Sequence, residues 1–179
     1  PLTSLSLIEI SNINKDSEII DVGCGKSFLI DNLLEKKYSK VSLLDISNNA
    51  LKEVKIRTKN FPNSGVFYNS DILDFNPDAN FDLWHDRAVL HFFTEQQQQE
   101  AYFKLLKTIL KPNGYVILAE FNKEGAKKCC GLNVINYNEI MLQERLGVDF
   151  KLLKTFNYTY TQPSGNTREY IYTLFQRIE

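Results

Sequence analysis

Residues 18–28 read Glu-Ile-Ile-Asp-Val-Gly-Cys-Gly-Lys-Ser-Phe, an apolar run that passes into two closely spaced glycines. The apolar part predicts a buried strand, and Gly23 and Gly25 predict a turn. Glycine has no Cβ and adopts positive φ, so the backbone there can approach a ligand closely. A helix from about Ser27 would then offer free N–H groups. Asp45 ends the next apolar run, 22 residues beyond Gly23, near the offset of about 20 at which a carboxylate reaches a ribose. The pattern predicts a nucleoside-containing cofactor.

The glycine spacing discriminates between cofactors. A dinucleotide fingerprint needs a third glycine that would fall at position 28, where this chain has Phe28. Asp21 lies two residues before the first glycine, and its charge would repel a pyrophosphate but tolerate a cationic ligand. NAD is therefore disfavoured. A strand-to-helix turn without any ligand remains an open alternative.

The string Asp21-Val-Gly-Cys-Gly-Lys-Ser27 resembles the first motif of class I S-adenosylmethionine-dependent methyltransferases, D/E-x-G-x-G-x-G. Ser27 replaces the last glycine of that motif. The resemblance implies that Asp21, Gly23 and Gly25 bind S-adenosylmethionine, with S-adenosylhomocysteine as the product.

Composition favours a single globular domain. The 179 residues carry a net charge of −1 and three cysteines, so neither a basic nucleic-acid footprint nor a disulfide framework is indicated. No apolar run reaches the ~18 residues that span a bilayer. We expect one methyltransferase domain over 1–179, a cytoplasmic location, and neither nucleic-acid nor membrane partners. Relatives carry an N-terminal segment with Trp and Tyr that covers the cofactor, and we expect this chain to lack it. The oligomeric state is not predicted.

Apolar runs alternate with helical patterns, which is typical of an α/β protein with a parallel sheet. The ranges with strand character are 18–22, 40–45, 66–68, 81–85, 115–121, 150–158 and 169–177. The ranges with helical character are 3–13, 27–37, 49–58, 94–110 and 138–146. This order resembles the Rossmann-like class I methyltransferase fold, which implies strand order 3-2-1-4-5-7-6 with a C-terminal antiparallel hairpin.

Two further segments resemble cofactor motifs. Asp45-Ile46 follows the second strand, and the resemblance implies that Asp45 accepts both ribose hydroxyls while Ile46 lies against the adenine. Residues 69–73 resemble a third motif, in which Asp71 accepts from the adenine amine and the Ile72 N–H faces a ring nitrogen. A helix-capping role for Asp45 and a turn role for Asp71 remain open.

Residues 81–92 contain both histidines and the only tryptophan of the chain, at the carboxyl end of the fourth strand, where open α/β sheets bind ligands. No Asn/Asp-Pro-Pro-Tyr string is present, so amino-methylating enzymes of DNA bases or glutamine are not resembled. The segment is similar to bacterial methyltransferase-domain proteins of unnamed substrate. It more loosely resembles lysine methyltransferases of elongation factors, with Arg87 at the lysine position. We predict that His85 and Arg87 contact the cofactor and that Asp86, His85 and, more weakly, His91 are catalytic.

Strand alternation predicts that Leu83 and His85 face one side of the sheet while Trp84 and Asp86 face the other. We expect this alternation to stop after His85, so that Asp86 and Arg87 turn toward the acceptor. The alternative is a structural network, in which Asp86 pairs with Arg87 or with a backbone group, His85 is a polar residue at the strand end, and His91 is a packing residue.

Methyl transfer from a sulfonium rests mainly on positioning the acceptor and excluding water. A general base is needed only if the acceptor must lose a proton. The leading interpretation is a methyltransferase of small molecules. The alternatives are a protein lysine methyltransferase and a non-catalytic module that binds S-adenosylmethionine. Cys129 and Cys130 lack a zinc spacing, so no metal is expected.

Overall fold

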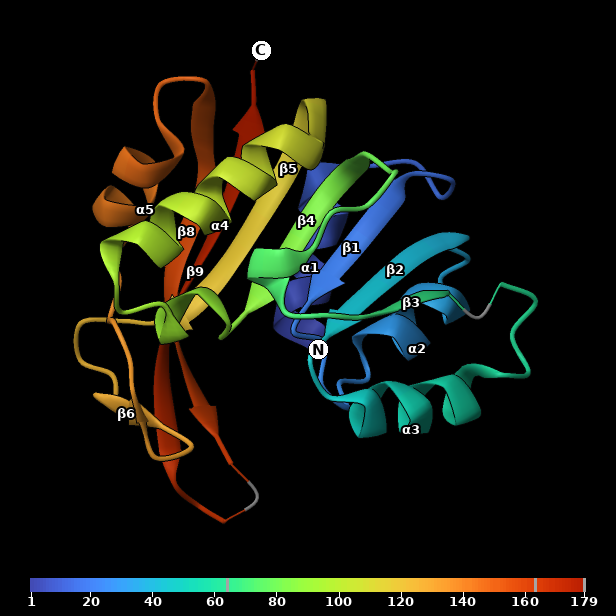
Figure 1. The fold of residues 1–179 in the computed structure, drawn as a ribbon, viewed down its shortest axis with the longest axis horizontal. Coiled ribbons are helices and arrows are strands. Elements are labelled where there is room, and N and C mark those ends of the chain that lie inside the picture. The colour runs from blue at the N-terminus through green and yellow to red at the C-terminus, as the bar shows by residue number, and fades with distance from the viewer. Residues whose placement is uncertain (64, 163, 179) are drawn as a thin grey trace.

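A computed structural model describes residues 1–63, 65–162 and 164–178. A sheet lies between two layers of helices (Figure 1). Its strands are β1 (Glu18–Val22), β2 (Lys40–Asp45), β3 (Val66–Asn69), β4 (Phe81–Arg87), β5 (Leu110–Phe121), β8 (Phe150–Thr161) and β9 (Thr167–Arg177). The α-helices are α1 (Leu2–Ser11), α2 (Leu29–Glu35), α3 (Asn48–Thr58), α4 (Gln96–Ile109) and α5 (Glu139–Leu146). Two short 3-10 helices are η1 (Ile72–Asp74) and η2 (Leu90–Phe92).

The sheet has seven strands in the order β3-β2-β1-β4-β5-β9-β8. The pairs among β1 to β5 are parallel, whereas β9 runs antiparallel to both β5 and β8. Counted within this sheet alone, β8 is the sixth strand and β9 the seventh. The expected order 3-2-1-4-5-7-6 with a C-terminal hairpin is confirmed.

Side-chain alternation divides the core into two layers. Ile19 and Leu83 pack on one face of the sheet with residues of α1, α2 and α3. Ile20 and Trp84 pack on the other face with residues of α4 and α5. Figure 1 shows α4 and α5 in front of the sheet and α1 behind it. Each layer is continuous and apolar, as burial on both faces of a parallel sheet requires.

Strands β3, β4, β5, β8 and β9 are longer than the sequence predicts, and the added residues at the end of β4 decide the site. β4 continues past His85, because Asp86 and Arg87 pair with Leu118 and Ala119 of β5. The alternation therefore continues to the end of β4. As a result Asp86 faces the α4 side of the sheet and Arg87 faces the α1 side.

The expected loop around the paired cysteines contains a small hairpin of β6 (Lys128–Cys129) and β7 (Leu132–Asn133). Cys130 and Gly131 form its turn with positive φ values of 50° and 83°. In the part of the chain that the structure describes, no helix is long and apolar enough to cross a lipid bilayer.

Candidate active site

Two adjoining cavities lie where the parallel strands end. The larger has a volume of about 490 Å³ and is lined from β1, β2, η1 and the segment after β4. The smaller has a volume of about 340 Å³ and is lined from α1, the glycine turn, β4 and the β8–β9 hairpin. Gly23 and Ala88 line both cavities, so a single elongated ligand can occupy the two together.

The turn after β1 is pressed against neighbouring strands. The N–H groups of Gly23 and Cys24 both donate to the Leu44 carbonyl, at 2.7 and 3.2 Å. Gly23 has φ +60°, and a Cβ there would overlap the Val89 side chain. Gly25 has φ +53°, but a Cβ there would meet nothing within 4 Å. Gly23 is thus required by packing, whereas Gly25 leaves room at the edge of the larger cavity.

Ser27 replaces the third motif glycine without loss of the helix start. Its Oγ accepts from the Leu29 N–H at 3.1 Å, and its carbonyl accepts from the Arg57 guanidinium at 2.6 Å. Arg57 also forms a bidentate pair with Asp31, with both distances 2.8 Å. Sequence reasoning missed this tether, because Arg57 on α3 lies 30 residues from Ser27 and no local pattern links them.

Asp45 lines the larger cavity and organises its wall. One carboxylate oxygen accepts from the Gly25 N–H at 2.7 Å, and the other accepts from the Ser47 N–H at 2.7 Å. Ile46 beside it is 73% exposed, and Phe92 adds a further apolar surface to this cavity. Asp45 therefore has a local structural role and is also placed to meet a ligand.

Asp71 and Ile72 line the same cavity. The Asp71 carboxylate accepts from the Leu73 N–H at 2.9 Å, which caps η1. The Ile72 side chain is buried in the second core layer. The turn role considered for Asp71 is confirmed, and both residues remain at the expected edge of the cavity.

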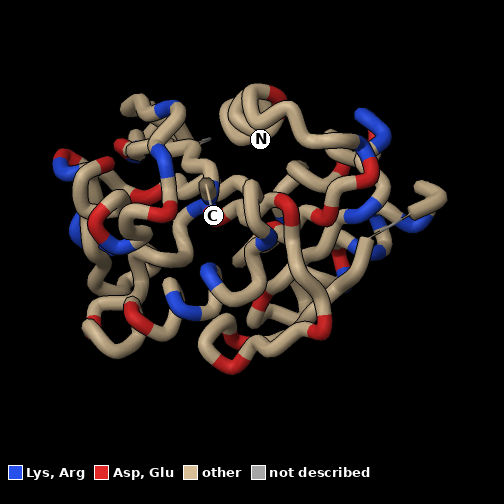
Figure 2. The backbone as a smooth tube through the Cα atoms, turned by 90° about the horizontal axis from the view of Figure 1, so that it is seen from above, with Lys and Arg blue, Asp and Glu red and all other residues tan. Residues whose placement is uncertain are grey.

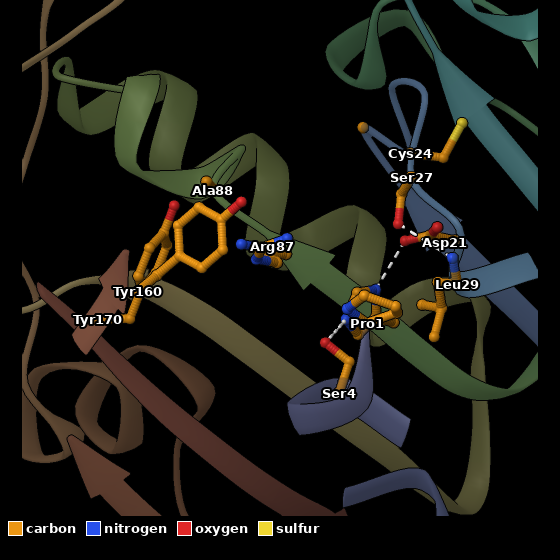
Figure 3. A pocket seen from close by; sticks show the side chains of 12 residues that line it. Pro1, Ser4, Asp21, Cys24, Ser27, Leu29, Arg87, Ala88, Tyr160 and Tyr170 are labelled. Atoms are coloured by element: carbon orange, nitrogen blue, oxygen red, sulfur yellow. Dashed lines mark hydrogen bonds and ion pairs between the residues drawn. The ribbon is translucent and has the colours of Figure 1, made fainter. Parts of the chain in front are cut away.

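A polar chain crosses the smaller cavity. Asp21 and His85 are register partners on β1 and β4, and their Oδ1 and Nδ1 atoms lie 2.6 Å apart. The His85 Nε2 lies 2.8 Å from the Ser4 Oγ of α1. All three side chains are buried and line the cavity. Figure 3 shows Asp21 and Ser4 facing it. The two ring nitrogens of His85 are thus both engaged.

Arg87 occupies another part of the same cavity. Its guanidinium carbon lies 5.1 Å from the centroid of the Tyr160 ring and 5.4 Å from that of Tyr170. Its Nε is buried without a hydrogen-bond partner. Within residues 1–63, 65–162 and 164–178 it forms no ion pair with Asp or Glu. In Figure 3, Arg87 lies beside the two tyrosines, with Cys24 and Ser27 on the opposite side of the cavity.

The prediction that Asp86 turns toward the acceptor is wrong. The residue is fully buried and lines neither cavity. Its carboxylate accepts from the N–H groups of Val89 and Leu90 and, at 2.6 Å, from the Tyr102 hydroxyl. Burial raises the pKa of Asp86 to about 6. The physical reason for the correction is the extension of β4, which directs this side chain into the α4 layer. The described residues contain no Asp86–Arg87 ion pair, and the structural alternative holds in its other form, with Asp86 paired to backbone groups.

His91 also lies outside both cavities. It is fully buried, and its Nδ1 lies 3.3 Å from a carboxylate oxygen of Glu120. Burial lowers the pKa of His91 to about 4. Burial and the nearby Asp86 charge raise the pKa of Glu120 well above its usual range. The ring contacts Phe92 and Phe121, which fits the packing alternative.

Of the predicted site residues, all but two line the cavities. The predicted residues that line a cavity are Asp21, Gly23, Gly25, Asp45, Ile46, Asp71, Ile72, His85 and Arg87, and the two exceptions are Asp86 and His91. Sequence reasoning missed Ser4, Tyr160 and Tyr170, which reach the site only through tertiary packing. Among the described residues no group of three or more His, Cys, Asp or Glu is placed to hold a metal ion.

Known proteins share this architecture. The family described as a methyltransferase domain matches residues 13–175. Malonyl-acyl-carrier-protein O-methyltransferase 2 of Ilyobacter polytropus is 30% identical over 115 residues, which are 62% of this chain and 43% of that protein. The chain spans about half the length of the curated relatives it matches, 43% and 54%.

Solved structures agree on the fold. An S-adenosylmethionine-dependent methyltransferase from Methanosarcina mazei has a TM-score of 0.76 at 18% identity, covering 96% of this chain and 97% of that one. The N-methyltransferase NodS from Bradyrhizobium japonicum, in complex with S-adenosyl-L-homocysteine, has a TM-score of 0.74 at 17% identity, covering 98% and 85%. The chain therefore belongs to the methyltransferase-domain family and has the class I methyltransferase fold.

Proposed function

We propose that this protein transfers a methyl group from S-adenosylmethionine to a small molecule. The observation that carries the proposal is the meeting of two chemically different cavities at Gly23 and Ala88. The larger is lined by apolar side chains with the two carboxylates of Asp45 and Asp71 at its edge. The other contains charged groups at the end of β4. A cofactor with its nucleoside in the larger cavity and its charged, reactive end in the smaller one would match these two cavities.

The larger cavity fits an adenosine group. Each carboxylate oxygen has two lone pairs, and each oxygen of Asp45 already accepts one backbone N–H. One lone pair on each oxygen therefore remains for a ribose hydroxyl. Ile46 and Phe92 provide apolar surface for the base, and Asp71 lies at the same opening for its exocyclic amine. The open space beside Gly25 leaves the ribose room to approach the backbone.

The smaller cavity fits the charged end of the cofactor. When bound, S-adenosylmethionine supplies an electrophilic methyl group on a positively charged sulfur. The Asp21 carboxylate lies beside Gly23 in this cavity, and its negative charge favours a cation there. Asp21 also fixes the orientation of His85 through their 2.6 Å contact.

His85 is the only one of the three proposed catalytic residues that lines a cavity. If Asp21 accepts the Nδ1 proton, Nε2 is left as the acceptor that faces Ser4 and the cavity. We assign His85 to receive a proton from the methyl-accepting substrate, where that substrate must lose a proton. Asp86 and His91 are assigned to the scaffold, because their contacts are to buried backbone and aromatic groups and, for His91, to the buried Glu120 carboxylate.

A small or carrier-bound substrate agrees with the names of the relatives, which include enzymes that act on a malonyl-acyl carrier protein and on didemethyltoxoflavin. The lysine methyltransferase and the non-catalytic module are not favoured by these relatives. Figure 2 shows Lys and Arg interspersed with Asp and Glu along the chain, and we propose no nucleic-acid partner. The unpaired cysteines Cys24, Cys129 and Cys130 support a cytoplasmic location.

Calorimetry tests the proposal. We expect S-adenosylhomocysteine to bind and NAD to bind more weakly or not at all. Asp45→Ala should weaken S-adenosylhomocysteine binding by ~1.5–3 kcal/mol, because hydrogen bonds to a charged acceptor are lost. Asp78→Ala, at an exposed aspartate outside both cavities, is the matched control and should bind normally. Tighter binding of NAD than of S-adenosylhomocysteine would refute the proposal.

A further inference from the structure

We infer that the methyl acceptor is a small carboxylic acid whose carboxylate is held by Arg87 between Tyr160 and Tyr170. This inference rests on the proposed function, because it assigns the acceptor to the part of the smaller cavity that the cofactor leaves open. It adds the chemical class of the acceptor and the residues that select it.

The first argument is the charge of Arg87. It is the only Lys or Arg among the side chains described as lining the smaller cavity. A guanidinium stays protonated at any ordinary pH, and its Nε is buried without a hydrogen-bond partner. The residue as a whole is half-buried, and a partly desolvated charge without an ionic partner is destabilising. A ligand that brings a negative group to this position would supply the missing partner.

The second argument is the shape of the Arg87 environment. Both tyrosine rings lie within cation–π range of the guanidinium, at 5.1 and 5.4 Å. A side-chain hydrogen bond also joins the guanidinium to Tyr172, and the N–H groups that Tyr172 does not engage stay available. These N–H groups form a fork that matches the two oxygens of a planar carboxylate. The tyrosines thus fix the cation while they leave its donor edge for a ligand.

The third argument is the separation of opposite charges in one cavity. Asp21 lies next to the glycine turn, where the cationic end of the cofactor is proposed to bind, and Arg87 lies toward the tyrosines (Figure 3). An anionic acceptor is attracted to Arg87 and repelled by Asp21. The two charges would therefore orient cofactor and acceptor in opposite parts of the cavity.

The fourth argument concerns the body of the acceptor. Tyr160 and Tyr170 belong to the β8–β9 hairpin, which extends beyond the rest of the sheet edge in Figure 1. Within the smaller cavity this hairpin supplies the rings of Tyr160 and Tyr170. An acid with an apolar or aromatic body would find partners in these two rings. Benzoate and hexanoate are therefore suitable probes, with benzamide and hexanamide as their neutral counterparts.

The test measures binding of these four probes by calorimetry, with and without saturating S-adenosylhomocysteine. The wild type should bind each acid at least tenfold more tightly than its amide. Arg87→Gln should reduce this preference to less than twofold, and Arg87→Lys should retain part of it. Arg168→Gln removes an arginine from the same hairpin that lines neither cavity, and this control should keep the full preference.

The alternative role for Arg87 is to hold the carboxylate of the cofactor itself. Under our inference, Arg87→Gln changes the dissociation constant of S-adenosylhomocysteine less than threefold. A tenfold or larger loss of that affinity, with the acid preference intact, would overturn the inference. Equal binding of acids and amides to the wild type, or tighter binding of inorganic phosphate than of either acid, would also overturn it.

The same experiment separates the two proposals. If the wild type fails to bind S-adenosylhomocysteine, the proposed function fails, whereas the acid preference measured without that ligand still tests Arg87. Melting temperatures establish that each variant is folded. Should Arg87→Gln not fold, Arg87→Lys carries the test, because it keeps the charge and loses the fork. A Lys variant that shows the full wild-type preference would overturn the bidentate assignment.

Discussion

Tyr102→Phe is expected to destabilise the protein strongly without moving any residue of the cavities. The Tyr102 hydroxyl is fully buried. It accepts from the Trp84 Nε1 at 3.0 Å and donates to the Asp86 carboxylate at 2.6 Å. Phenylalanine keeps the ring and removes both hydrogen bonds. A neutral bond contributes about 1 kcal/mol and one to a charged acceptor about 1.5–3 kcal/mol, so we expect a loss of ~3 kcal/mol in the free energy of unfolding. For a domain of this size that corresponds to a melting temperature lower by ~6–12 °C.

The loss of stability in Tyr102→Phe should also depend on pH. Burial raises the pKa of Asp86 to about 6, while donation by Tyr102 acts in the opposite direction by favouring the carboxylate. The deficit of Tyr102→Phe should therefore be larger at pH 8, where Asp86 is ionised, than at pH 5, where it is mostly protonated. Urea unfolding at both pH values measures this loss in the free energy of unfolding. Tyr68→Phe, at a half-buried tyrosine whose ring contact with Phe75 survives the change, is the control and should cost less than ~0.5 kcal/mol.

Two outcomes would refute the reasoning. One is a deficit below ~1 kcal/mol at pH 8, which is less than a single hydrogen bond to a charged group contributes. The other is a tenfold loss of S-adenosylhomocysteine affinity in a variant that is folded at the assay temperature. The second result would place the Asp86 network in the binding site and restore the prediction that the structure contradicts.

Three further predictions concern other positions. Gly23→Ala should fail to fold or melt far below the wild type, because its Cβ overlaps Val89, whereas Gly25→Ala should fold and bind S-adenosylhomocysteine more weakly; equal melting temperatures would contradict this. The raised folded-state pKa of Glu120 means that its stabilising contribution is complete below its unfolded pKa and is lost as the pH rises through the folded value. As the pH rises from 5 to 8, Glu120→Gln should therefore gain stability relative to the wild type. A melting temperature that falls further below that of the wild type over this pH range would contradict this prediction. Arg57→Ala should lower the free energy of unfolding by ~1–2 kcal/mol and weaken S-adenosylhomocysteine binding by loosening the glycine turn. An unchanged dissociation constant by calorimetry would show that the contacts of Arg57 with Ser27 and Asp31 do not support the binding site.

The sequence allows the fold to be predicted well because each strand is a compact apolar run with clear turn signals. β1 and β2 have the predicted bounds, and the position of Asp45 follows from them. Spacing along the chain also suffices to identify the larger cavity, because its residues follow directly from three strand ends.

The acceptor side could not be predicted in the same way. The roles of Asp86 and Arg87 depend on where β4 ends, and that end is set by pairing with β5, about 30 residues later. Tyr160 and Tyr170 reach Arg87 only through the register of the β8–β9 hairpin. Such long-range pairings have no local signature, and an error of two residues in one strand end placed Asp86 on the wrong face of the sheet.

The extension of β4 to Arg87 has a consequence for engineering. Adjacent positions 86 and 87 point into different environments, so a library at position 87 can be screened for new acceptors while the hydrogen bonds of Asp86 are left untouched. Tyr160 on the edge strand β8 extends the same freedom, because it is half-buried and lines the cavity, whereas Tyr170 on β9 belongs to the buried core. If Arg87 selects the acceptor as we propose, acceptor choice and folding stability depend on neighbouring side chains that alternate along β4, and position 87 can be varied without changing Asp86.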